Sequence, residues 1–152
     1  MLRQLLMAAA ISACTIMIHA LVMTAVVRTS QATAIKVAAR PNLLLIAVMV
    51  VTVSVLMAAH TCEVIVWSLA YGLLDAVPAG TNLLYFAFVN YTTLGYGDVV
   101  PVERWQLLGP ITAMNGVLLF GWSTAVIFEV LRKTMAVTAS ADDSLSSTRD
   151  LT

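Results

Sequence analysis

The chain has 152 residues, of which 61% are hydrophobic and 11% are charged. A soluble domain usually carries about 25% charged residues. This composition therefore excludes an ordinary soluble surface and indicates that most of the surface faces lipid. The eight basic and eight acidic residues cancel, which argues against nucleic acid as a partner.

The two cysteines, Cys14 and Cys62, lie inside apolar runs without metal-ligand spacing. A disulfide between them requires that the fold bring them together. Two buried thiols are therefore the expected state of these residues.

The first predicted element is a membrane-spanning helix over residues 5–27. This nearly uncharged run of about 23 residues exceeds the length of about 20 that crosses the hydrocarbon core. Residues 28–41 follow as a polar, basic linker. We expect residues 1–41 to form an N-terminal transmembrane helix and a cytoplasmic loop.

The next predicted element is an outer helix over residues 42–74. As one helix it would be roughly 48 Å long, which exceeds the bilayer core. We therefore expect this helix to tilt, to project into water, or to break near Gly72. The turn-rich loop Asp75–Thr81 follows it.

The last elements are a short helix over residues 82–92, a loop, and an inner helix over residues 105–131. The short helix has about 11 residues, too few to span the membrane. The inner helix ends at Arg132 and Lys133, and the polar residues 134–152 are expected to be a disordered cytoplasmic tail.

The loop between the short helix and the inner helix holds the segment TTLGYGD, Thr92–Asp98. Non-helical backbone at membrane depth is tolerated only where it is buried in protein or lines a watery path. Gly95 and Gly97 can adopt backbone angles closed to other residues, and alternating such angles can turn successive carbonyls toward one axis. Rings of carbonyls can replace the water shell of a cation. We therefore predict an all-α membrane protein with three transmembrane helices and a re-entrant pore helix.

This segment resembles the selectivity-filter signature of the potassium channel family, with Leu94 in place of the commoner valine or isoleucine. The resemblance covers residues 42–132, and the predicted pore domain is 42–133, with the filter at 93–97. Pro101 and Trp105 match positions after the filter in small bacterial members.

The resemblance implies the roles of the filter residues. Dehydrated K⁺ binds the backbone carbonyls of Thr93, Leu94, Gly95 and Tyr96 together with the Thr93 hydroxyl, and Gly97 lies at the outer mouth. Thr92 and Asp98 complete the signature, and Asp98 is expected to hold the filter loop by hydrogen bonds. The short helix directs the negative end of its dipole toward the pore, which favours a cation.

The sequence also departs from the family pattern. Val89 stands where some members carry a glutamate that pairs with the aspartate after the filter. Tyr85 and Phe86 stand where some members carry two tryptophans, so different hydrogen bonds are expected around the filter. Without an arginine-rich span, voltage sensing by charged helices is not expected.

Glu63 is the one acid inside the second apolar run, at the depth expected for the filter. We expect it either to support the filter by a hydrogen bond with the pore helix or filter surroundings, or to be an interfacial acid in water. His60, one turn earlier, can pair with it, although a lone satisfied histidine is the simpler interpretation. His19 is expected to make a polar contact between helices.

Three further residues of the inner helix carry open alternatives. Gly116 and Gly121 match two glycines of the family's inner helix, where the first is a candidate gating hinge. They can equally be close-packing sites. Glu129 near the inner end either forms a cation-attracting ring or faces outward.

The topology follows from the family's pore loop, which enters from outside. With three spans, residues 28–41 then lie inside, the N-terminus outside and the C-terminus in the cytoplasm. The basic residues agree with the positive-inside rule, since only Arg3 precedes the first span. The expected location is the plasma (inner) membrane.

The sequence thus predicts a potassium-selective channel subunit that conducts K⁺ passively and is not an enzyme. One filter strand cannot encircle an ion, so we expect a homotetramer in the lipid bilayer. K⁺ is the transported ion, and no organic cofactor, nucleotide or nucleic acid is expected. A weakly selective cation channel and a non-conducting regulatory subunit are the alternatives.

Overall fold

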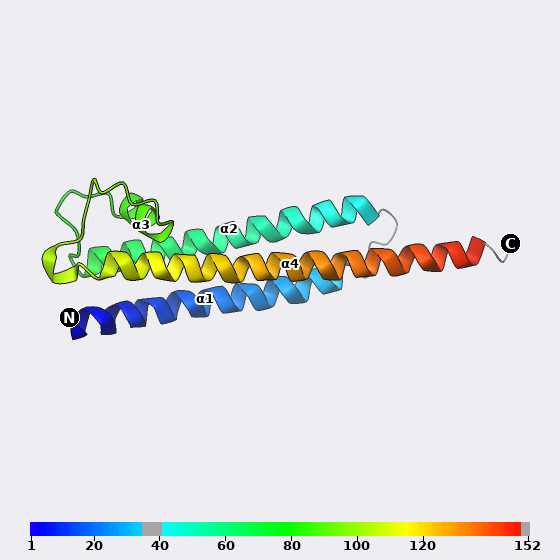
Figure 1. Ribbon diagram of the computed structural model, residues 1–152, viewed down its shortest axis with the longest axis horizontal. Helices are drawn as coiled ribbons and strands as arrows, with labels where there is room; N and C mark the ends of the chain where they lie inside the picture. The colour runs from blue at the N-terminus through cyan, green and yellow to red at the C-terminus, as the bar shows by residue number, and fades with distance from the viewer. Residues whose placement is uncertain (35–40, 150–152) are drawn as a thin grey trace. The chain divides into compact units, whose positions relative to one another are not determined.

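A computed structural model of the chain describes residues 1–34 and 41–149. These residues form helices and connecting loops, and no strand occurs among them. The elements are α1 (Leu2–Ala34), α2 (Pro41–Leu73), α3 (Leu83–Tyr91), the 3-10 helix η1 (Glu103–Trp105) and α4 (Leu108–Arg149) (Figure 1). The predicted all-α fold is therefore confirmed.

Three of the described helices are long and apolar enough to cross a membrane. The candidate spans are Leu2–Thr29, Leu45–Leu73 and Glu103–Ala136. In lipid, a helix satisfies every backbone polar group within its own segment, which is why such apolar runs become helices. The prediction of three helices that are long and apolar enough to span a membrane is confirmed. α2 starts at Pro41 and runs through Gly72 without the break that was one expectation there.

The described chain divides into two compact units, and α1, α2 and α4 contribute to both. Unit 1 comprises residues 1–21 and 58–122. Unit 2 contains the described part of residues 22–57 and 123–152. Unit 1 thus holds α3 and the segment that resembles a filter.

The core of unit 1 is built around aromatic side chains. Tyr71 of α2 packs edge-on against Phe86 of α3, with ring centroids 4.8 Å apart. The Tyr71 hydroxyl lies 2.6 Å from the Thr112 Oγ1 of α4. Trp67 and Tyr91 are also fully buried in this core. These contacts hold α3 against α2 and α4.

Unit 2 has a smaller aliphatic core that includes Met23, Leu56 and Val126. Glu129 of α4 belongs to this unit, where it forms ion pairs with Arg132 at 2.8 Å and Lys133 at 3.1 Å. Both partners lie one turn further along the same helix. The Glu129 carboxylate is thus neutralised locally, and neither alternative considered for it included this pairing.

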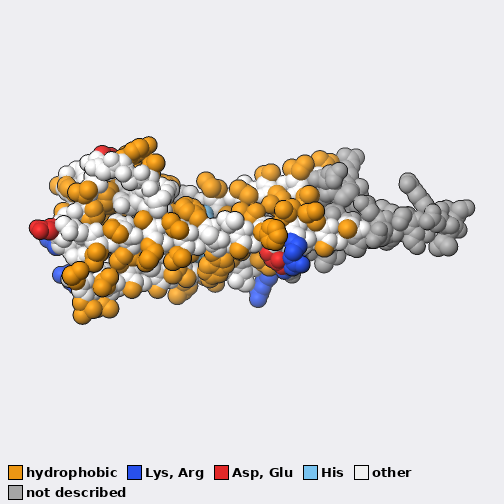
Figure 2. Space-filling view, viewed as in Figure 1, with side chains coloured by type: hydrophobic (Ala, Val, Ile, Leu, Met, Phe, Trp, Pro, Cys, Tyr) orange, Lys and Arg blue, Asp and Glu red, His pale blue; other side chains and the backbone are white. Residues whose placement is uncertain are grey.

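Apolar side chains are spread over the face drawn in Figure 2. Many large ones are exposed, among them Leu21, Val51, Met57 and Leu69. Cys14 and Cys62 are also exposed and free. The expectation of buried thiols was wrong because the apolar surroundings of a membrane helix can be lipid instead of protein.

The C-terminal residues differ from the expectation of disorder from residue 134. α4 continues to Arg149, and residues 150–152 lie outside the described part of the chain. Extending an existing helix adds one hydrogen bond for each residue that is fixed, which favours continuation into a polar segment. The basic linker expected at 28–41 is also shortened, since α1 reaches Ala34 and residues 35–40 are outside the described part.

Candidate functional site

The short helix α3 is defined by its two caps. Asn82 adopts an extended conformation, and its side-chain oxygen accepts a hydrogen bond from the backbone N–H of Tyr85 at 3.1 Å. Thr92 closes the other end, where its N–H and its hydroxyl both donate to the Phe88 carbonyl. The helix has nine residues, or roughly 14 Å, which is about half of the bilayer core.

The chain after α3 folds back on the end of this helix. The N–H of Thr93 donates to the Asn90 carbonyl at 3.0 Å, and the N–H of Leu94 donates to the Val89 carbonyl at 3.0 Å. The N–H of Gly95 also reaches the Val89 carbonyl, at 3.4 Å. The position where some potassium channels carry a glutamate therefore contributes its backbone to the start of the loop.

The backbone of residues 93 to 97 alternates in handedness. Thr93, Gly95 and Gly97 have φ angles of 60°, 57° and 78°, whereas Leu94 and Tyr96 between them are not among the residues with positive φ. A positive φ is rare for a residue with a side chain, such as Thr93. Alternation of this kind can turn successive carbonyls toward one side, and glycine makes it accessible at two of the three positions.

These residues are exposed in the single chain. Leu94 is 55% exposed and Tyr96 is 67% exposed. Within the described part of the chain, no N–H donates to the backbone carbonyls of residues 93 to 97. The carbonyl oxygens of this segment are thus left without a hydrogen-bond donor from the described part of the chain.

Asp98 is linked to the start of α3 through Tyr85. Desolvation raises the pKa of the Tyr85 hydroxyl, and the hydrogen bond to Asp98 and the charge of this carboxylate act in the same direction. Tyr85 stands where some members of the family that the sequence resembles have a tryptophan. Its hydroxyl makes a polar contact with Asp98 of the loop. The sequence indicated a changed hydrogen-bond pattern here without naming this pair.

Glu63 is buried in unit 1 and contacts the C-terminal end of α3. The Tyr91 hydroxyl donates a hydrogen bond to its carboxylate, and His60 and His19 lie on the same carboxylate. Glu63 has no exposed surface, so the interpretation as an interfacial acid in water was wrong. The contribution of Tyr91 was missed because a tyrosine in an apolar helix looks like a packing residue.

The two glycines of α4 have different surroundings. A Cβ atom at Gly116 would lie 2.0 Å from the Tyr91 carbonyl oxygen, whereas a Cβ at Gly121 would meet nothing within 4 Å. Of these two glycines, Gly116 is therefore the one at which α4 closely approaches the end of α3. This supports the close-packing interpretation at Gly116.

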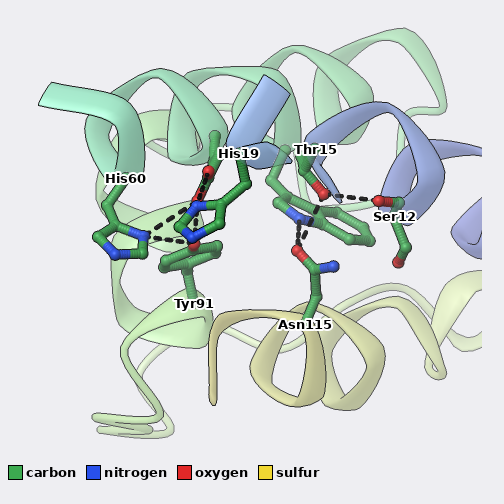
Figure 3. A network of polar contacts seen from close by, with 8 residues as sticks. Ser12, Thr15, His19, His60, Tyr91 and Asn115 are labelled. Carbon is green, nitrogen blue, oxygen red and sulfur yellow. Dashed lines mark hydrogen bonds and ion pairs between the residues drawn. The ribbon is translucent and has the colours of Figure 1, made fainter. Parts of the chain in front are cut away.

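The first helix contacts the rest of unit 1 at several polar points. The Thr15 hydroxyl donates to Asn115 Oδ1 of α4 at 3.0 Å, and Trp67 Nε1 donates to the same oxygen at 3.3 Å. Near the N-terminus, the Arg3 guanidinium lies 5.3 Å from the centroid of the Trp105 ring. Figure 3 shows Thr15 and Asn115 pointing toward one another beside the cluster of His19, His60 and Tyr91.

A family model described as "Ion channel" matches residues 46–133, more than half of the 152 residues. The chain belongs to this ion channel family. The matched range contains α3 and the loop with alternating backbone, together with most of α2 and the first part of α4. No similar protein was found among curated proteins, and none was found among solved structures. The family and the three apolar helices identify the chain as a membrane ion channel protein.

Proposed function

We propose that the chain is a subunit of a potassium-selective channel and that residues 93 to 97 are its selectivity filter. The observation that carries the proposal is the alternating backbone of these five residues, with positive φ at Thr93, Gly95 and Gly97. Such a backbone aligns carbonyl oxygens along one side. Carbonyl oxygens can replace the hydration shell of a potassium ion.

The proposed filter requires several copies of the chain. One strand supplies one oxygen at each level, and four strands supply a ring of four. We therefore propose a homotetramer in which the carbonyls of Thr93, Leu94, Gly95 and Tyr96 and the Thr93 hydroxyl form successive K⁺ sites. The exposure of Leu94 and Tyr96 in the single chain supports this arrangement, because partner copies would cover these side chains.

The short helix α3 is proposed as a re-entrant pore helix. It is too short to cross the membrane, and it is followed by non-helical backbone, which at membrane depth must line a watery path or be covered by protein. The negative end of its dipole would then face the ion path. Transport is passive, driven by the K⁺ gradient.

The proposed orientation places the N-terminus and the mouth of the pore on the outside. Arg3 lies against Trp105, which follows the loop after Asp98, so the start of α1 is at the same end of unit 1 as this loop. The basic residues Arg132 and Lys133 near the end of the third span favour a cytoplasmic C-terminus. The proposed location is the plasma (inner) membrane.

The test is ion flux through the purified protein in liposomes, with K⁺, Rb⁺ and Na⁺ gradients compared. We expect flux of K⁺ and Rb⁺ well above that of Na⁺, and loss of this selectivity in Gly95→Ala, because alanine at φ 57° is strained by about 1–2 kcal/mol per chain.

The matched control is Gly80→Ala. Gly80 also has a positive φ, 83°, and an open environment, but it lies in the loop before α3. This variant carries similar strain and should keep the selectivity. Equal flux of K⁺ and Na⁺ would instead identify a weakly selective channel. A stable tetramer without flux under any gradient would favour a regulatory subunit.

A further inference from the structure

A compact group of side chains of metal-ligating types lies inside unit 1 and is distinct from the proposed filter carbonyls. His19 of α1 and His60 and Glu63 of α2 place their ligand atoms within 4.8 Å of one another. His19 Nδ1 lies 2.7 Å from Glu63 Oε1, and His60 Nδ1 lies 3.0 Å from Glu63 Oε2. The two imidazole rings lie beside one another, with centroids 5.2 Å apart (Figure 3).

The group is enclosed by protein. His19 and Glu63 are 0% exposed and His60 is 8% exposed. Aromatic rings of α4 cover it, since Phe120 lies 4.6 Å from His60 and Trp122 lies 5.3 Å from His19 between ring centroids. The ligands therefore sit in surroundings of low polarity, where an ionic contact is much stronger than in water.

The charge of Glu63 needs a positive partner in these surroundings. A buried carboxylate without a compensating charge is strongly unfavourable. Among the described residues, no lysine or arginine forms an ion pair with Glu63, whose pairs are with His19 and His60. A divalent cation bound to two imidazoles and one carboxylate would compensate this charge directly.

The geometry fits zinc after a small adjustment. Zinc bonds of about 2.0–2.2 Å in a tetrahedral arrangement hold neighbouring ligand atoms about 3.3–3.5 Å apart. The contacts of His19 and His60 to the two Glu63 oxygens would therefore widen by roughly 0.3–0.8 Å. Separations between ligand atoms that now reach up to 4.8 Å would shorten. The Tyr91 hydroxyl lies 3.0 Å from His60 Nδ1 and bonds Glu63, so it can supply a fourth oxygen or orient the carboxylate.

The donor set also selects the class of metal. Calcium and magnesium prefer sites made of oxygen atoms, whereas two imidazoles with one carboxylate suit zinc and its transition-metal neighbours. We propose that His19, His60 and Glu63 form a binding site for a zinc-class divalent metal ion, which fastens α1 to α2 beside the end of α3.

The test uses the full-length protein, purified in detergent without a histidine tag, in a Cys14→Ser/Cys62→Ser background that removes thiolate ligands. After chelation, the protein is titrated with Co²⁺, whose visible absorption reports tetrahedral coordination. We expect one Co²⁺ per chain, displaced by Zn²⁺, and a higher unfolding temperature when Zn²⁺ is present. No step depends on ion flux, so the outcome is separate from that of the proposed channel function.

Two variants and a control locate the site. Glu63→Gln and His19→Gln each remove a ligand and should weaken Co²⁺ binding by roughly 100-fold or more, beyond the 10–100-fold typical of residues that only orient ligands. Glu103→Gln, at an exposed acid of η1, should bind like the parent protein. His19→Gln lies in α1, so it is informative if Glu63→Gln fails to fold.

Two results would overturn the proposal. One is a folded, metal-free parent protein that binds Co²⁺ no better than His19→Gln. The other is an unfolding temperature that Zn²⁺ leaves unchanged. Either result would show that the group is a hydrogen-bond network only.

Discussion

Replacing Gly116 by alanine tests the closest approach between α4 and α3. The added Cβ would lie 2.0 Å from the Tyr91 carbonyl oxygen, 3.0 Å from its carbonyl carbon and 3.3 Å from its ring. Ordinary non-bonded contacts lie at about 3.5–4 Å, so one helix would have to move by roughly 1–1.5 Å. Two of the three atoms belong to the backbone, which cannot turn aside as a flexible side chain can.

The expected loss of stability is about 1–3 kcal/mol per chain, the range found when a well-packed core is overfilled. An alanine in a helix is also more favourable than a glycine by about 0.8–1 kcal/mol, which offsets part of this loss. Gly121→Ala receives the same helical gain without the clash, because nothing lies within 4 Å of its added Cβ. The difference between the two variants therefore isolates the steric effect.

The assay is thermal or denaturant unfolding of both variants in the same detergent, followed by K⁺ flux in liposomes. Gly116→Ala should unfold more easily than Gly121→Ala and should conduct less, because the displaced end of α3 leads directly into Thr92 and Thr93. Equal stability of the two variants would refute the close approach. Reduced flux at unchanged stability would instead favour the hinge interpretation of Gly116.

Three other substitutions test single contacts. Asn82→Ala removes the N-cap of α3 and should lower the free energy of unfolding by about 1 kcal/mol, measured in denaturant. Tyr85→Phe removes the hydroxyl that bonds Asp98 and should shorten the time over which K⁺ flux persists in liposomes. An unchanged duration of K⁺ flux would show that this contact does not hold the loop. Thr15→Val removes the hydrogen bond to Asn115 at 3.0 Å. It should lower the free energy of unfolding by about 0.5–1.5 kcal/mol, measured by thermal unfolding.

The sequence predicted the described helices because run length and hydropathy constrain a membrane chain strongly. A run of about 20 apolar residues has few alternatives to a helix in lipid, and the 9-residue α3 was recognisable as too short to span. The helix ends were predicted less well. α4 reaches Arg149 instead of ending near 131, because hydropathy marks where a helix leaves the bilayer and not where it stops.

The lateral contacts were harder to predict. Lipid and protein interior are equally apolar, so an apolar residue such as Cys14 does not report which side of its helix faces protein. The pairing of His60 with Glu63 could be considered because they lie one turn apart on α2. His19 and Tyr91 both contact the Glu63 carboxylate. These contacts depend on how α1, α2 and α3 are rotated about their axes, which hydropathy does not encode.

The polar residues of α1 nevertheless carry a signal of this rotation. Gln4, Thr15 and His19 fall within roughly 60° of one another around an ideal helix axis. Each of them bonds another segment of unit 1: the backbone N–H of Leu107, Asn115 and Glu63, respectively. In an apolar span, polar side chains face protein because lipid offers them no partner. One polar stripe along the first helix thus marks the face by which it packs, and this face reaches the carboxylate that also holds the end of α3.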